Sequence, residues 1–341
     1  MADLRFSIGD LPISNLQSPI TNLKSPGRNM FWYCLLLLLG YATAIVPVRL
    51  SYAVASLLGD VAYLFWRSKG LIARESMRRV LGPDSPLPQA RALARRSLRN
   101  YAKSLVDFLR FPRLTVHELE ALIAQSFGWE NLESALQAGK GVILVSPHFG
   151  SWDFAGAILG LRGYQLHAVA DAFKSARANE LVQRSRLARG IDIIPFGGAL
   201  KKLYQALRRG EIVALVLDRP MAGSGVAVRF FGEEAYLPAG PAALALKTGA
   251  SIILGYCVRH PQDETKFLGG FFPPLQFVPT GQRERDIPAL TQKIAEDLEA
   301  IIRLYPDQWY PFHNIWTHDP ALQAVSLGEP TPVAGYGESL A

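Results

Sequence analysis

The chain has 341 residues, 49% of them hydrophobic, and a formal net charge of +7. This length allows one or two domains, and the apolar fraction is large enough to bury a sizeable core. The two cysteines, Cys34 and Cys257, offer no disulfide framework, and no H-E-x-x-H or C-x-x-C pattern occurs, so we expect neither a metal site nor a bound cofactor.

The N-terminal part divides into a polar and an apolar segment. Residues 1–29 show no helical period, and we expect a disordered extension or a start codon assigned too far upstream. Residues 30–66 are predicted to be a membrane anchor, because the run 31–48 has eighteen residues without a charge, just enough to cross a bilayer core. Pro47 and Arg49 interrupt the run. The anchor is therefore one span followed by a surface helix, or a shallow hairpin in one leaflet, and a buried helix of a soluble protein is the alternative.

A basic stretch follows the anchor. Between Arg67 and Lys103 there are ten basic and two acidic residues, so nearly all of the excess charge lies here. Basic residues next to an anchor favour the cytoplasmic side and attract anionic lipid headgroups. A solvated basic face is the plainer interpretation. Nucleic acid is not expected as a partner, because no RNA- or DNA-binding motif accompanies the charge.

From there to residue 318 the chain alternates between predicted helices and strands. Helices are expected at 91–109, 118–125, 131–137, 179–189, 200–209, 239–248 and 286–305, and strands at 142–145, 165–170, 191–195, 212–217, 251–258 and 271–277. This alternation predicts an α/β fold, a doubly wound and mostly parallel or mixed sheet with helices on both faces. We assign 67–318 to this domain. Residues 319–341 are rich in Gly, Pro, Ala and Glu and are expected to be a disordered tail.

The chemistry is expected where the strand at 142–145 ends. Ser146 and Pro147 stop the strand, and His148 and Asp153 then lie in the turn before a helix, where open α/β sheets place their sites. A carboxylate on one ring nitrogen would fix the tautomer of His148 so that the other nitrogen accepts a proton. A turn histidine bonded to a carboxylate for structure alone gives the same spacing.

Several neighbours of this pair are candidate substrate-binding residues. Gly150 and Ser151 lead into the following helix, whose N–H groups are suited to face a developing oxyanion. Asp218 and Arg219 end the strand at 212–217, and a charged pair there needs partners. Arg184, Arg186 and Arg189 are suited to bind a phosphate, although each also fits a solvated helix face.

The stretch from His148 to Asp153 resembles the H-x4-D/E block of the lysophospholipid acyltransferase superfamily. The chain is most similar to the branch with the lipid A biosynthesis lauroyl/myristoyl acyltransferases and the phosphatidylinositol mannoside acyltransferases. Further similar blocks lie at 91–112, 179–200, 217–219, 230–232 and 238–250. Asp at position 153, and Asp218 followed by Arg219, look more like the mannoside acyltransferases.

The resemblance implies a bacterial inner-membrane acyltransferase whose catalytic domain faces the cytoplasm. His148 would be the general base and Asp153 would orient it. The 218 block would bind the acceptor or complete the active site. The implied partners are membrane lipids, an acyl-CoA or acyl carrier protein donor, and a glycolipid acceptor. The alternatives are acylation of a lysophospholipid or glycerol phosphate, hydrolysis of lipid esters, and a non-catalytic lipid-binding scaffold.

Overall fold

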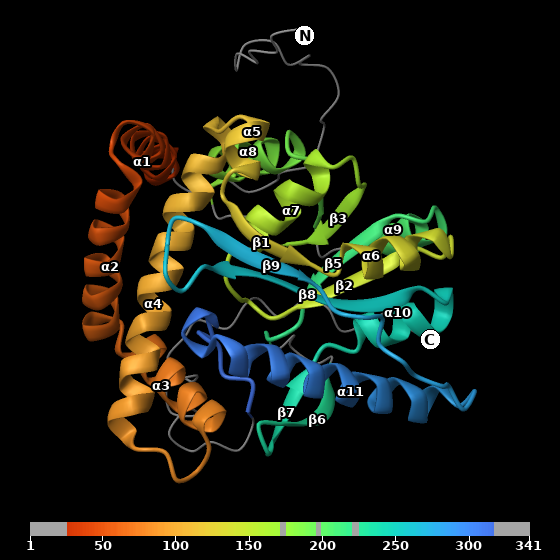
Figure 1. Cartoon of the computed structure of the whole chain (residues 1–341). Coiled ribbons are helices and arrows are strands. Elements are labelled where there is room, and N and C mark those ends of the chain that lie inside the picture. Colours follow the sequence, from red (N-terminus) through yellow and green to blue (C-terminus); the bar gives the residue numbers. More distant parts are fainter. Residues whose placement is uncertain (1–25, 171–174, 196–198, 220–224, 317–341) are drawn as a thin grey trace, which may run out of the picture.

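A computed structural model describes residues 26–170, 175–195, 199–219 and 225–316 (Figure 1). The expected extension and tail lie outside these residues, except that 26–29 already belong to the first helix. Four helices precede the sheet: α1 (Pro26–Ile45), α2 (Val48–Phe65), α3 (Arg67–Leu81) and α4 (Leu87–Arg110). They stand together at one side of the sheet, and α2 runs along α4.

The sheet has seven strands in the order β1-β9-β8-β2-β5-β3-β4. The strands are β1 (Ile123–Phe127), β2 (Val142–Ser146), β3 (Leu166–Val169), β4 (Ile191–Ile194), β5 (Ile212–Val216), β8 (Ser251–Arg259) and β9 (Phe267–Phe271). All neighbours pair in parallel except β8 and β9. The predicted α/β fold with a mostly parallel sheet is thereby confirmed.

Helices cover both faces of this sheet, as predicted. One face carries α5 (Val116–Glu120), α6 (Trp129–Gln137) and α7 (Trp152–Leu161), and α8 (Ala176–Leu187) packs beside β4 and α1. The other face carries α9 (Ala199–Arg208), α10 (Gly240–Thr248) and α11 (Arg283–Leu304). Burial on both sides explains why the central strand β2 reads as an unbroken apolar run, with Val142 to Val145 all buried.

Two expectations for elements were wrong, and one pair of strands was not expected. The helix expected at 118–125 is the short α5 followed by strand β1, which pairs with β9 at the sheet edge. A strand was expected at 271–277. In the structure the strand, β9, begins earlier, at Phe267, and ends at Phe271. An antiparallel hairpin, β6 (Val226–Phe230) and β7 (Glu233–Leu237), forms a separate small sheet that the sequence did not reveal.

The apolar N-terminal segment is two helices with a break at Pro47. Within the described residues one helix, α2, is long and apolar enough to cross a membrane; the apolar part of α1, Tyr33–Ile45, is shorter. The run at 31–48 is divided between two helices, because α1 ends at Ile45 and Pro47, which has no N–H to continue it, precedes α2. The membrane anchor expected at 30–66 stays a prediction.

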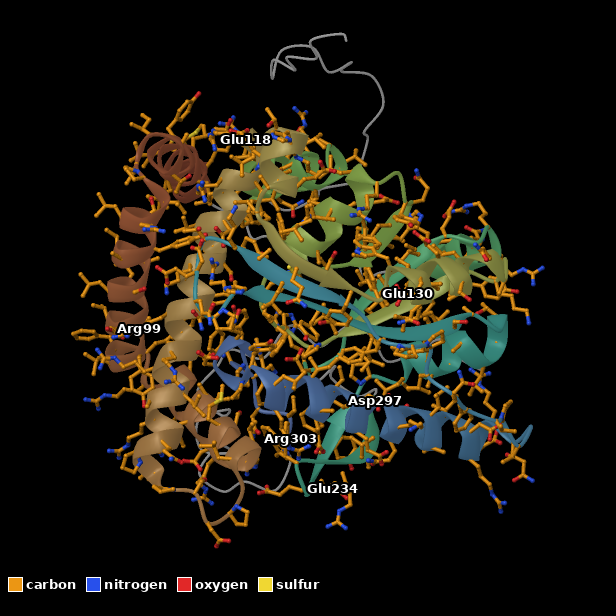
Figure 2. All side chains as sticks on the ribbon, in the orientation of Figure 1. Arg99, Glu118, Glu130, Glu234, Asp297 and Arg303 are labelled. Carbon is orange, nitrogen blue, oxygen red and sulfur yellow. The ribbon has the colours of Figure 1, made fainter. Side chains whose placement is uncertain are left out.

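The inner face of α2 is fastened to the domain. Tyr52 donates a buried hydrogen bond to Asp107 of α4, and Asp107 also binds Arg259 at the end of β8. Asp60 accepts hydrogen bonds from Arg95 and Arg99. A Cβ at Gly59 would lie 2.8 Å from the Cα of Arg99, so the two helices touch there backbone to backbone. The side chain of Arg99, labelled in Figure 2, reaches from α4 to Asp60 of α2.

Candidate active site

The loop after β2 holds His148 against the middle of the sheet. Pro147 ends the strand, and Gly150 has a φ of 60°. A Cβ at Gly150 would lie 2.0 Å from the carbonyl oxygen of Cys257 on β8, so only glycine fits this close approach. The Gly150 N–H donates to the carbonyl of Gln308, and the Ser151 N–H donates to that of Cys257. The loop is thus fixed between β8 and the short 3-10 helix η2 (Pro306–Gln308).

His148 faces Asp218. The two strands β2 and β5 are parallel neighbours with Ser146 opposite Val216, so each functional residue lies two positions beyond its strand. The Nδ1 atom of His148 is 2.6 Å from Oδ1 of Asp218, and the same oxygen accepts the backbone N–H of His148 at 2.8 Å. The structure therefore places Asp218 on the ring nitrogen for which the sequence suggested Asp153.

Asp218 is buried, with 3% of its surface exposed. Its second oxygen, Oδ2, accepts a 2.7 Å hydrogen bond from the indole N–H of Trp309. Burial by itself raises the pKa of this carboxyl, but the positive charge of a protonated His148 and the hydrogen bonds from His148 and Trp309 outweigh it and hold the pKa below its ordinary value. The carboxylate stays ionised and fully hydrogen-bonded in the apolar interior.

The other ring nitrogen of His148, Nε2, makes no hydrogen bond to any residue that the structure describes. The side chain is 14% exposed, and its ring meets the edge of Trp152 at a centroid distance of 5.5 Å. With Nδ1 donating its proton to Asp218, the geometry assigns the lone pair to Nε2. This arrangement is suited to take a proton from a hydroxyl group that reaches the ring.

Asp153 lies in the first turn of α7 and is engaged elsewhere. Its two oxygens accept hydrogen bonds from Arg186 of α8, at 2.8 Å to Nε and 3.3 Å to Nη2. The pair ties α8 to the helix that follows the His148 loop. The predicted partner of His148 was Asp153. In the structure the carboxylate on His148 comes from Asp218, and Asp153 binds Arg186.

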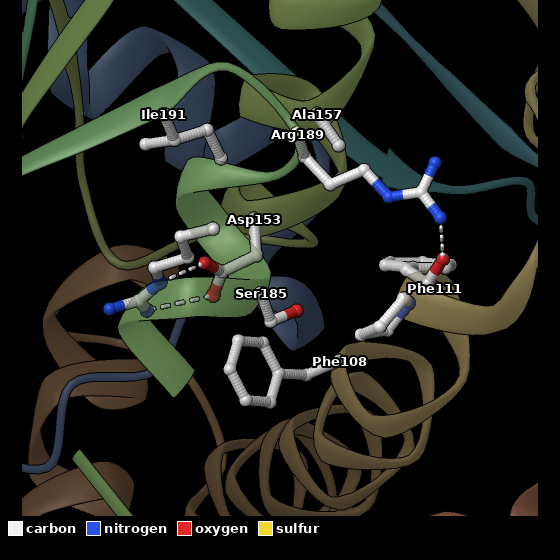
Figure 3. Close-up of a pocket in the computed structure, with 9 residues that line it drawn as sticks. Phe108, Phe111, Asp153, Ala157, Ser185, Arg189 and Ile191 are labelled. Carbon is white, nitrogen blue, oxygen red and sulfur yellow. Dashed lines mark hydrogen bonds and ion pairs between the residues drawn. The ribbon is translucent and has the colours of Figure 1, made fainter. Parts of the chain in front are cut away.

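A small pocket opens beside the Asp153–Arg186 pair (Figure 3). Its empty volume is about 280 Å³, part of which is open solvent. Phe108, Phe111, Pro112, Ala157 and Ile191 supply the apolar wall, and Asp153, Ser185, Arg186 and Arg189 supply the polar one. The pocket therefore joins hydrocarbon surface to charge beside the first turn of α7, the helix that follows the His148 loop.

The other two arginines of the 184–189 run also have protein partners. Arg184 forms an exposed ion pair with Glu180 on the same helix. Arg189 donates to the carbonyls of Phe111 and Leu114 at 2.8 and 2.7 Å, and partial burial lowers its pKa. These two side chains are used within the protein in this conformation and are not brought to His148.

Arg219 differs from them. It is exposed at the end of β5, directly after Asp218, and its side chain makes no hydrogen bond or ion pair with a described residue. Because it follows Asp218, the partner of His148, its backbone lies next to the His148 loop. Of the substrate-binding candidates, Arg219 has the most freedom to meet a ligand.

The amides of Gly150 and Ser151, two of the candidate substrate-binding residues, donate to protein carbonyls. The first-turn N–H groups of α7, from Trp152 to Phe154, have no intrahelical acceptor.

Trp309 was not predicted as a site residue, because nothing in the local sequence links it to Asp218. Within the described ranges no group of three or more His, Cys, Asp or Glu side chains is arranged to hold a metal ion.

The sequence of the chain is similar to those of known acyltransferases. The sequence model of the bacterial lipid A biosynthesis acyltransferase family matches residues 20–318. A phosphatidylinositol mannoside acyltransferase from Mycobacterium tuberculosis (strain H37Rv) is 30% identical over 290 residues, covering 82% of this chain and 88% of that protein. The protein of the same name from Mycolicibacterium smegmatis is 30% identical over 251 residues, covering 72% and 79%.

Proposed function

The chain belongs to the bacterial lipid A biosynthesis acyltransferase family and is an acyltransferase, and we propose that it moves a fatty acyl chain from a thioester to a hydroxyl group of a membrane glycolipid. The observation that carries this proposal is the His148–Asp218 pair: Nδ1 is held by a buried carboxylate at 2.6 Å while Nε2 is free. The proposed transfer needs no cofactor. Acyl-CoA or acyl carrier protein brings the fatty acyl chain as the co-substrate.

The proposed reaction is direct transfer. Nε2 of His148 removes the proton of the acceptor hydroxyl as its oxygen attacks the thioester carbonyl, and Asp218 stabilises the imidazolium that forms. The C–S bond then breaks, the new ester remains on the acceptor, and the thiolate takes up the proton from His148. Arg219 and the first-turn N–H groups of α7 are the groups best suited to stabilise the tetrahedral oxyanion.

We propose a phosphorylated glycolipid as the acceptor, of the phosphatidylinositol mannoside or lipid A type. The similarity to two phosphatidylinositol mannoside acyltransferases supports the first type, as does the Asp218-Arg219 sequence. The exposed guanidinium of Arg219, which follows the His148 partner Asp218 in the chain, is suited to bind a lipid phosphate. The apolar wall of the pocket at Phe108 and Ile191 gives hydrocarbon surface near the same loop.

We propose that the enzyme is held on the inner face of the bacterial cytoplasmic membrane by α1 and α2 lying in one leaflet. One face of α2 is apolar and exposed, with Leu50, Val54, Leu57, Leu58, Val61, Leu64 and Phe65 on it. Leu38, Leu39, Tyr41 and Ile45 are exposed on α1. The opposite face is fastened to α4 by Tyr52 and Asp60. If α2 crossed the bilayer, it would leave α4 and uncover the buried carboxylate of Asp107. A position of α2 in the plane of one leaflet keeps this contact and therefore costs less free energy.

Charge adds less to this attachment than the sequence suggested. Many of the cations between 67 and 103 are engaged in ion pairs, including Arg95 and Arg99 with Asp60, Arg74 with Glu75, and Lys103 with Glu264. Ion-paired side chains attract anionic lipid less than free ones. We therefore assign most of the membrane affinity to the apolar face of α2.

The test supplies purified full-length protein with palmitoyl-CoA or palmitoyl carrier protein and, in separate reactions, phosphatidylinositol mannoside, lipid A precursor, a neutral glycolipid and a lysophospholipid. We expect thiol release that depends on a phosphorylated glycolipid and yields its acylated product. Preference for the lysophospholipid would overturn the proposed acceptor class. Thiol release of equal rate without any acceptor would identify a thioesterase activity, and no release with either donor would contradict the proposed acyl donors.

A further inference from the structure

The buried oxygen of Asp218 that faces away from His148 has its own dedicated partner. Oδ1 accepts both hydrogen bonds from His148, and Oδ2 accepts the indole N–H of Trp309 at 2.7 Å. Trp309 is completely buried. Because water does not surround either group, the indole is the only donor among the described residues that satisfies Oδ2.

Trp309 also belongs to a backbone brace of the catalytic loop. The Tyr310 N–H donates to the carbonyl of His148 at 2.9 Å, and the Gly150 N–H donates to the carbonyl of Gln308 at 2.8 Å. These bonds flank an antiparallel bridge between Phe149 and Trp309. The same short segment therefore holds both halves of the proposed dyad, the His148 loop through its backbone and Asp218 through the indole.

The brace is anchored on two further elements. The hydroxyl of Ser97 on α4 donates to the carbonyl of Trp309, and the side chain of Gln308 is hydrogen-bonded in both directions to the backbone of Arg259 on β8. These contacts leave the indole little freedom to turn away from Asp218. Its orientation is set by the fold rather than by a bound substrate.

We propose that Trp309 is a positioning residue for the acyl transfer, whose indole N–H fixes the Asp218 carboxylate in the orientation that keeps a proton on Nδ1 of His148 and leaves Nε2 free. The proposal rests on the proposed function, because it assumes that His148 is the base. Without this donor the carboxylate has a buried oxygen with no partner, so it would rotate or admit water, and the His148 ring would lose its fixed tautomer.

The chain offers a matched control. Trp316 is also buried in the aromatic cluster around Phe230, and its indole N–H donates to the carbonyl of Phe230 at 3.1 Å, but it does not contact Asp218. Trp309→Phe and Trp316→Phe each remove one indole and one hydrogen bond from the same core. A loss specific to Trp309→Phe therefore separates positioning of Asp218 from general loosening of the core.

We expect kcat to fall about 10- to 100-fold in Trp309→Phe, since a hydrogen bond to a charged group is worth this factor, with KM for donor and acceptor nearly unchanged. Trp316→Phe should lower kcat less than threefold. The acid limb of the pH–rate profile should move to higher pH in Trp309→Phe alone, because the indole hydrogen bond lowers the pKa of Asp218 and its loss makes this carboxylate more basic. Equal kinetics in the two variants would overturn the proposal.

A second measurement needs no catalysis. In substrate-free protein, the proton between Nδ1 of His148 and Asp218 should give a downfield NMR signal, identified by its loss in His148→Gln. We expect the signal to persist in Trp316→Phe and to shift or broaden in Trp309→Phe. An unchanged signal in Trp309→Phe would contradict the positioning role whether or not His148 proves to be the base.

If Trp309→Phe does not fold, the nitrogen alone can be replaced. Incorporation of benzothienylalanine at position 309 keeps the shape of the side chain and substitutes sulfur for the N–H. The same fall in kcat and the same change in the NMR signal are expected, and wild-type behaviour of this variant would contradict the proposal.

Discussion

Asp218 binds His148 twice with one oxygen, accepting the ring Nδ1 at 2.6 Å and the backbone N–H at 2.8 Å, although 70 positions separate the two residues in the chain. The double contact fixes the ring and the loop that carries it in a single step. It is possible because β2 and β5 are parallel neighbours in register, so that their carboxyl ends meet at the same edge of the sheet. The relative position of His148 and Asp218 is therefore set by the pairing of these two central strands.

The two candidate carboxylates should behave differently on substitution. Asp218→Asn removes the charge that stabilises the imidazolium and should lower kcat about 10²- to 10⁴-fold, as expected for the carboxylate of such a pair. Asp153→Asn should cost about tenfold or less and should be matched by Arg186→Gln, because these two residues bind each other. Initial rates at saturating acceptor would measure both. A larger loss for Asp153→Asn than for Asp218→Asn would show that the apo geometry does not represent the reacting enzyme.

Arg219 is predicted to bind the acceptor or the oxyanion. Arg219→Gln should reduce kcat/KM about 10- to 100-fold, the usual value of a hydrogen bond to a charged group. Arg184→Gln is the matched control, because Arg184 is similarly exposed but forms an ion pair with Glu180. It should change kcat/KM less than twofold. Equal effects of the two substitutions would remove Arg219 from the site.

The attachment of α2 to α4 should weaken in acid. Hydrogen bonds from Arg95 and Arg99 hold the pKa of Asp60 well below its ordinary value. A carboxyl with a depressed pKa in the folded protein stabilises it above the unfolded-state pKa of about 3.9, and this contribution is lost as the pH falls below that value. Urea unfolding should therefore show wild type more stable than Asp60→Asn at pH 7, with the gap closing towards pH 3. A gap that widens in acid would contradict this assignment.

The two native cysteines report on the membrane position. Cys34 on α1 is exposed, whereas burial raises the pKa of the Cys257 thiol to about 12 and leaves almost no reactive thiolate. A membrane-impermeant maleimide should label Cys34 and spare Cys257 at neutral pH, and Cys34→Ser should abolish labelling. Addition of anionic vesicles should protect Cys34. Undiminished labelling on vesicles that bind the protein would exclude insertion of α1 at that point.

The sequence was sufficient for the parts of the fold that local patterns encode. The apolar run from Val142 to Val145, stopped by Pro147, gives a strand because β2 is buried on both faces, and the position of His148 beyond it follows. Edge elements were harder to predict. The exposed middle of β1 has no apolar signature, and β6 and β7 form a two-stranded sheet apart from the main one.

The partner of His148 could not be predicted from local sequence either. Asp153 is close in sequence, whereas the closeness of Asp218 depends on which strand lies next to β2, and strand order is a property of the whole sheet. The role of Trp309 depends on the path of the chain after α11, which brings the segment at 306–310 back to the catalytic loop. Resemblance pointed to the 218 block, but only the packed structure shows which atoms meet.

The central claim is that His148 is the base of an acyl transfer, and the most direct measurement is transfer of a radiolabelled acyl chain from its thioester to a phosphorylated glycolipid in vesicles by wild type and His148→Ala. We predict that wild type forms the acylated lipid, that His148→Ala forms at least 10²-fold less, and that both sediment equally with the vesicles. Transfer by His148→Ala at the wild-type rate would contradict the account.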